Sequence, residues 1–161
     1  MKDIATISFY WLHLLAAMFW VGGIAFILLI ALPSSKKTLG SDSGRIMGEI
    51  AGRFGPLANW CILMLITTGV GLTALSSHYE GAILAGDSWR VVLLAKLVLV
   101  SVMVAIHFFR GLILSRMIAR AEEDEGKSSL QKLSLNLVKV NLALGSAILL
   151  LSVAQSSLRG Y

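Results

Sequence analysis

Four long runs of apolar residues dominate the chain, and charged residues lie mainly between them. A helix needs about 20 apolar residues to cross the hydrocarbon core of a bilayer, and lipid offers no partner for a free backbone N–H or C=O group. We therefore expect an all-α, multi-pass membrane protein whose residues 1–161 form one four-helix transmembrane bundle. The runs are 4–32, 54–77, 91–109 and 140–158, and they predict helices at about 4–32, 54–78, 89–115 and 133–158.

Two features next to these runs refine the prediction. The first run follows Lys2, as in a signal peptide, but it is too long for an h-region and shows no small-residue cleavage site, so we take it as a retained helix. Ile46, Ile50 and Phe54 recur every four residues before the second run. This spacing predicts a short amphipathic helix lying on the cytoplasmic face.

Composition excludes several classes of protein. Of the 161 residues, 57% are hydrophobic and 14% are charged, and the mean hydropathy is +0.80. Such a chain is too apolar for a disordered protein and has too few polar residues to cover a soluble enzyme. Cys61 is the single cysteine, which excludes a disulfide framework and any multi-cysteine metal site.

The basic residues predict an orientation. The chain has 14 Lys and Arg residues against 9 Asp and Glu, a net charge of +5. Ten of the basic residues flank the first and third connections, three lie on the other side and Lys96 lies inside a run. By the positive-inside rule, both termini lie on the outer, periplasmic side of a bacterial inner (cytoplasmic) membrane. The net charge therefore indicates topology and not a nucleic-acid partner.

Four ionisable residues in or beside the runs are candidate functional groups, because such residues are expensive in a membrane. They are His13, His78, Lys96 and His107. Counting about 1.5 Å per residue from the helix ends, His13 and His78 lie near the outer surface, Lys96 lies roughly 10 Å in and His107 lies near the cytoplasmic face. His13 and His78 could therefore share one ligand, whereas His107 could hold only a separate one.

Two imidazoles at one level could serve as metal ligands. They suit the axial positions of a b-type haem, and the same pair could instead help to hold copper. The structural alternatives are that His13 hydrogen-bonds to a neighbouring helix and that His78 is a solvated residue at a helix end.

Lys96 is the candidate catalytic residue. It could carry a proton or hold a haem propionate or another anionic ligand. It could instead reach the outer surface, where Glu80 and Asp87 are partners. Lys96, Met103, His107 and Arg110 form one stripe on the third helix, which we expect to face the bundle interior.

Sulfur side chains give a second candidate chemistry. Met18, Met64 and Met103 fall near mid-depth on three helices. Their thioethers could relay Cu(I), although core filling is the more common role of methionine. We interpret Cys61 as a small core residue.

The motifs HLLAAMFWVGG (from His13), LITTGVGL (with Thr68 and Gly69) and WRVVLLAKLVLV (from Trp89, with Lys96) resemble, in this order, those of the copper-resistance D (CopD) type membrane domain. The chain is also similar to the HemJ-type membrane protoporphyrinogen oxidases, a related four-helix family with haem b. That resemblance implies functional roles for His13 and Lys96 and places His107 where the family has a Tyr-His pair. Phe54-Gly55-Pro56 and LALPSSKK depart from this family's pattern, so the oxidase activity stays open.

Three functions remain. The first is a haem b redox protein that exchanges electrons with a quinone or a partner redox protein. His13, His78 and Lys96 would bind its cofactor in the outer half of the bundle, and His107 could bind an additional cofactor on the cytoplasmic side. The alternative is a copper-handling protein of CopD type. The third is an accessory subunit that packs, beside lipid, in a homo-oligomer or a larger membrane complex. The sequence favours the first.

Overall fold

The described part of the chain is almost entirely helical. A computed structural model describes residues 2–75, 87–121 and 124–157, and of these only Ala121 has an extended backbone, with ψ 117°. It contains four helices long and apolar enough to cross a membrane. This confirms the predicted all-α fold and the predicted number of spans. The chain divides into two compact units, one before and one after residue 86, and each is a helical hairpin.

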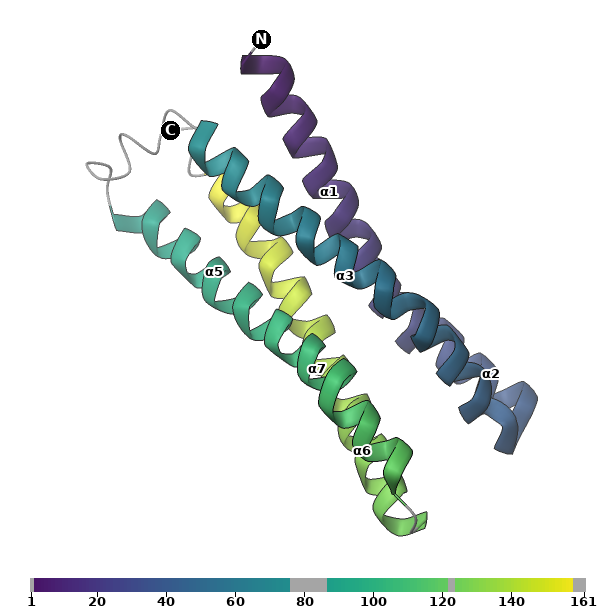
Figure 1. The fold of residues 1–161 in the computed structure, drawn as a ribbon. Helices are drawn as coiled ribbons and strands as arrows, with labels where there is room; N and C mark the ends of the chain where they lie inside the picture. The colour runs from purple at the N-terminus through teal and green to yellow at the C-terminus, as the bar shows by residue number, and fades with distance from the viewer. Residues whose placement is uncertain (1, 76–86, 122–123, 158–161) are drawn as a thin grey trace. The chain divides into compact units, whose positions relative to one another are not determined.

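The first hairpin is formed by the N-terminal half of the chain (Figure 1). Helix α1 (Lys2–Phe26) continues through a π-helical segment η1 (Ile27–Ala31) into α2 (Leu32–Leu39). A single 3-10 turn, η2 (Gly40–Asp42), leads into the return helix α3 (Ser43–Leu75), which packs along α1. The reversal needs Gly40, whose φ of 52° is strained for other residues.

The seam between α1 and α3 is lined by residues that recur every three or four positions. From α1 it buries Ala16, Trp20 and Ile24, and from α3 it buries Ala58 and Cys61. This spacing keeps one face of each helix toward the other. The burial of Cys61, which is 6% exposed, agrees with its interpretation as a core residue.

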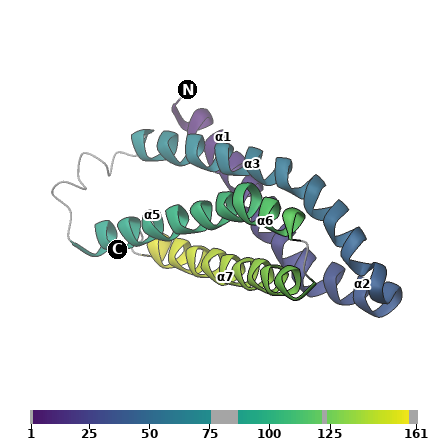
Figure 2. The same ribbon diagram turned by 60° about the horizontal axis from the view of Figure 1, so that its bottom comes forward.

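The second hairpin repeats the plan of the first. Helix α5 (Asp87–Phe108) continues through the π-helical segment η3 (Phe109–Leu114) into α6 (Ser115–Arg120), and α7 (Asp124–Ser157) returns beside α5. Figure 2 shows α5 and α7 side by side along most of their length. Met103, Leu114 and Asn141 are its most deeply buried large side chains, each about 1% exposed.

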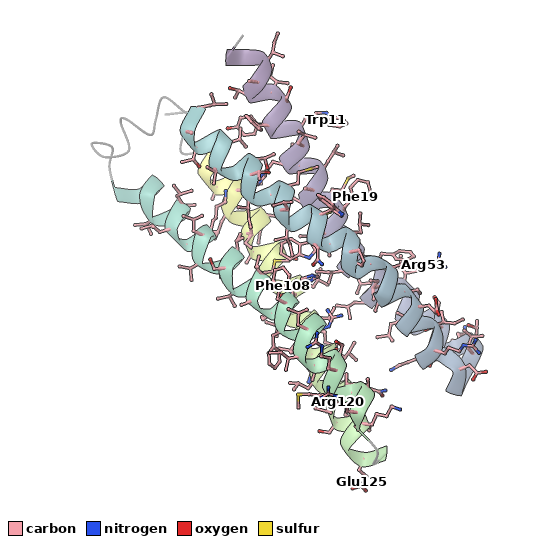
Figure 3. All side chains as sticks on the ribbon, viewed as in Figure 1. Trp11, Phe19, Arg53, Phe108, Arg120 and Glu125 are labelled. Carbon is pink, nitrogen blue, oxygen red and sulfur yellow. The ribbon has the colours of Figure 1, made fainter. Side chains whose placement is uncertain are left out.

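The outer faces of the helices are apolar and exposed. On α1, Trp11 and Phe19 are 63% and 50% exposed, and in Figure 3 they lie on the side of α1 away from α3. Large exposed apolar surfaces are unfavourable in water and favourable in hydrocarbon. The chain is therefore a multi-pass membrane protein whose helices contact lipid.

The helices are longer than the apolar runs. The predicted amphipathic helix before the second span is not separate, because residues 43–75 form one continuous helix, α3. Likewise, α7 begins at Asp124, well before the predicted start at residue 133. At about 1.5 Å per residue, the 33 residues of α3 extend roughly 50 Å, more than the ~30 Å core requires. Hydropathy detects only the lipid-embedded part of such a helix.

Among the described residues, each hairpin has one π-helical segment, which lies in its first arm. In η1, Pro33 provides a cause, because a proline ring clashes with the carbonyl four residues earlier and local π geometry relieves the clash. There the Leu32 N–H bonds to the Ile27 carbonyl, five residues back. In η3 the Ser115 N–H bonds in the same way to the Arg110 carbonyl, but no proline follows.

Candidate functional site

His13 lies in the seam of the first hairpin and contacts α3. Its Nδ1 lies 2.8 Å from the Thr68 hydroxyl oxygen. A Cβ added at Gly69 would lie 3.6 Å from His13 Cε1, and one added at Gly71 would lie 3.2 Å from the ring of Phe9. The aromatic rings of α1 therefore pack against the glycines of α3, which let the two backbones approach closely.

The hydrogen bonds around Thr68 define the tautomer of His13. The Thr68 hydroxyl is 2.6 Å from the carbonyl of Met64, one turn back on α3, and a carbonyl can only accept. The single hydroxyl proton is therefore donated to Met64, and the oxygen accepts a hydrogen bond from His13 Nδ1–H. In neutral His13 the lone pair is then on Nε2. Metal-binding histidines are commonly held in this way, one ring nitrogen donating to an oxygen while the other faces the metal.

Sulfur atoms lie on the same hairpin. Met64 is one helical turn from Thr68 and 39% exposed, whereas Met18 on α1 is 59% exposed. The third predicted relay residue, Met103, belongs to the second hairpin and is 1% exposed, and the relay stays a prediction. Among the described residues, no three His, Cys, Asp or Glu side chains come together as a metal site.

Lys96 and His107 belong to the second hairpin, on α5, and both are half-buried. Two residues of the same predicted stripe contact α7. The Met103 carbonyl accepts a hydrogen bond from Asn141 Nδ2 at 3.3 Å, and Arg110 Nε donates to the Ser134 hydroxyl at 3.2 Å. His107 packs edge-on against Phe108, with ring centroids 5.4 Å apart.

His78 lies outside the described residues, as does Glu80, a predicted partner of Lys96. The shared site of His13 and His78 therefore stays a prediction. The haem-binding and catalytic roles of Lys96 and His107 likewise stay predictions. The structure does tie the ring of His13 to a polar side chain on the facing helix α3.

Sequence reasoning passed over three uncharged polar residues. Thr68 was noted only as part of a motif, and Ser134 and Asn141 were not singled out. The search for costly groups counted ionisable side chains alone, although a buried amide or hydroxyl in a membrane span also requires a partner. A search for Asn, Ser and Thr within the spans would have found all three.

The fold and the His13 site define a class: a helical multi-pass membrane protein with a histidine held between two helices. A family model described as copper resistance protein D matches residues 48–155. The chain belongs to this family. A search of curated proteins and a search of solved structures gave no match.

The family match changes the weight of the predicted functions. It supports the copper alternative better than the haem b redox function, and it gives no support to electron transfer or to a relation with the HemJ-type oxidases. It overlaps only in part with the motif resemblance, which ran from the first helix to the third. The matched residues include α7 and exclude α1, with His13.

Proposed function

We propose that this chain handles copper at the membrane and that His13 binds the ion through Nε2. The observation that carries the proposal is the hydrogen bond from His13 Nδ1–H to Thr68. It holds the ring in the hairpin seam and makes Nε2 the nitrogen that carries the lone pair in neutral His13. Membership of the copper resistance protein D family is the reason for proposing copper as the ion.

The donor set of the first hairpin fits copper as cargo. Imidazole nitrogen suits copper in either oxidation state, and thioether sulfur favours Cu(I). We propose Met64 as the second ligand, because it lies one turn before Thr68 on α3, where its backbone carbonyl accepts the hydrogen bond of the Thr68 hydroxyl. With few ligands the ion would bind weakly enough to be passed on, which suits cargo better than a permanent structural site.

The proposed setting is the outer half of a bacterial inner membrane, with both termini outside. The distribution of basic residues supports this orientation, because the connections that carry ten of them would lie in the cytoplasm. His13 would then receive copper from the outer side. The family match and the four spans support a membrane location of this kind.

Competition for Cu(I) with a coloured chelator tests the proposal on the full-length protein in detergent. We expect His13→Ala to lower the affinity at least about tenfold, the effect typical of losing an interaction of ~1.4 kcal/mol or more. His107→Ala, in the second hairpin, is the matched histidine control and should bind like the unmodified protein. An His13→Ala variant with unchanged affinity would overturn the assignment.

A visible absorption spectrum distinguishes the haem alternative from the copper function. The His13 tautomer would also suit an axial ligand of haem. If copper is the cargo, protein produced with ample haem should show no Soret band that sharpens on reduction with dithionite. A band that is present, and lost in His13→Ala, would instead establish the haem function.

A further inference from the structure

Arg110 is a charged side chain inside a membrane-spanning helix, and the proposed copper function does not use it. It lies within the candidate span Val91–Arg120 and is half-buried. A cation in this position is costly unless it reaches an interface or an anion. Identifying the group that neutralises Arg110 therefore bears on the function of the protein.

The π-helical segment η3 is where Arg110 meets α7. The extra residue in a π turn changes the direction of the side chains that follow, and such turns are frequent at functional sites. Here Arg110 Nε donates to the Ser134 hydroxyl at 3.2 Å. A guanidinium has five N–H donors, so this bond uses one and orients the planar group, while four donors remain on its two terminal nitrogens.

No carboxylate in the described side chains of this hairpin is placed to neutralise Arg110. Glu125 carries the one carboxylate among them, and it precedes Ser134 by nine residues of α7, about 13 Å along the helix. The charge of Arg110 acts on His107, one turn before it, and a histidine is either neutral or positive. Within the described part of this hairpin, the surroundings of the guanidinium are thus neutral or cationic.

The surrounding charges attract anions to this end of the hairpin. Arg116 and Arg120 follow on α6, and Lys127 and Lys132 lie on the facing end of α7. Figure 3 shows Arg120 and Glu125 near the tip that α6 and α7 form. Arg110 lies ten residues before Arg120, about 15 Å along the helix, where a span of ordinary length would leave the hydrocarbon core.

We propose that Arg110, positioned by Ser134, binds a phosphate group at the membrane boundary, and that an anionic phospholipid headgroup supplies it. A planar guanidinium offers two parallel N–H bonds to two oxygens of one phosphate. The lipid is the favoured source because Arg110 lies at headgroup depth in a lipid-facing hairpin. Free phosphate offers the same chemistry and is the other source to distinguish.

Native mass spectrometry of the full-length protein with added phosphatidylglycerol, or with diacylglycerol, which has the same chains but no phosphate, tests the site. We expect one phosphatidylglycerol to be retained with about tenfold or greater preference, the effect of a charge-assisted hydrogen bond. Arg110→Gln should abolish the preference. Arg116→Gln is the control, because Arg116 is exposed on the same end and should contribute at most the roughly fivefold effect of a surface charge. Equal losses in the two variants would overturn the proposal.

A second variant and a competition experiment complete the test. Arg110→Lys keeps the charge but loses the planar fork, so we expect a clear loss of preference, and full retention would overturn bidentate binding. This variant carries the test if Arg110→Gln does not fold. Inorganic phosphate, added at millimolar concentration, should not displace the lipid. If it binds to the unmodified protein in place of lipid, and Arg110→Gln abolishes that binding, the lipid source is overturned.

Discussion

Replacing Thr68 with valine tests the hydrogen bond on which the copper site depends. Valine has nearly the shape of threonine but no hydroxyl, so the variant removes the acceptor of His13 Nδ1–H and little else. Thr67→Val is the matched control. The Thr67 hydroxyl donates to the Leu63 and Met64 carbonyls of its own helix, and its side chain is exposed.

The magnitude follows from what the variant leaves behind. A buried donor that loses its partner costs about 1–3 kcal/mol, although hydrogen bonds between membrane helices average only about 0.6 kcal/mol and reach about 1.7. We therefore expect Thr68→Val to lower the free energy of unfolding by about 1–2 kcal/mol. For Thr67→Val we expect less than about 0.5 kcal/mol. Loss of a partner that orients a metal ligand typically lowers metal affinity about 10–100-fold, and we expect this for Thr68→Val alone.

Two measurements check these values. Unfolding by sodium dodecyl sulfate in mixed micelles, followed by the fluorescence of the four tryptophans, gives the free energy. Competition with a chelator gives the Cu(I) affinity. Thr68→Ser keeps a hydroxyl at this position and should retain most of the free energy of unfolding and of the Cu(I) affinity.

The pattern of results can refute the reasoning in two ways. If Thr68→Val and Thr67→Val have the same stability and the same Cu(I) affinity, the bond to His13 does not hold the ring. If Thr68→Val is destabilised but binds Cu(I) normally, the bond only fixes the packing of α1 on α3. The copper site would then lack the observation on which we base it.

Two further predictions use the same unfolding assay. A Cβ at Gly23 would lie 2.8 Å from Phe54 Cζ, whereas one at Gly22 meets nothing within 4 Å. We expect Gly23→Ala to cost about 1–3 kcal/mol and Gly22→Ala to be neutral or up to ~1 kcal/mol stabilising; equal effects would contradict the close approach. Asn141 Oδ1 is buried with no donor among the described residues, so Asn141→Leu should change stability by less than about 1 kcal/mol. A larger loss would reveal a further partner of this amide.

The spans were predictable because charged side chains are strongly unfavourable in the hydrocarbon core of a bilayer. Long apolar runs identified all four helices, three of them without Lys, Arg, Asp or Glu and the third interrupted by Lys96 alone among these. The ends of α3 and α7 were not predictable in this way. Residues 43–53 and 124–132 are polar enough for water, so nothing in their hydropathy shows that they continue the helix begun in lipid.

The site was predictable only in part. His13 could be singled out because an ionisable group in an apolar run is costly. Its partner could not, because the pairing with Thr68 depends on how α1 and α3 are rotated about their axes, and an all-apolar surface gives little information on rotation. The identity of the ligand was equally open, since imidazole serves haem and copper alike and the sequence resembles both a copper-resistance and a haem-containing family. The family match then favoured copper.

The π-helical segments have a consequence for comparing relatives of this protein. A π turn holds one residue more than an α turn, so it behaves as a single-residue insertion that the helix absorbs without breaking. Relatives that lack Pro33 would not need the extra residue in Ile27–Ala31. An alignment that allows no gap inside a membrane helix would then misplace every residue on one side by about 100° around the helix. A one-residue gap at this point would keep His13 aligned with its counterparts.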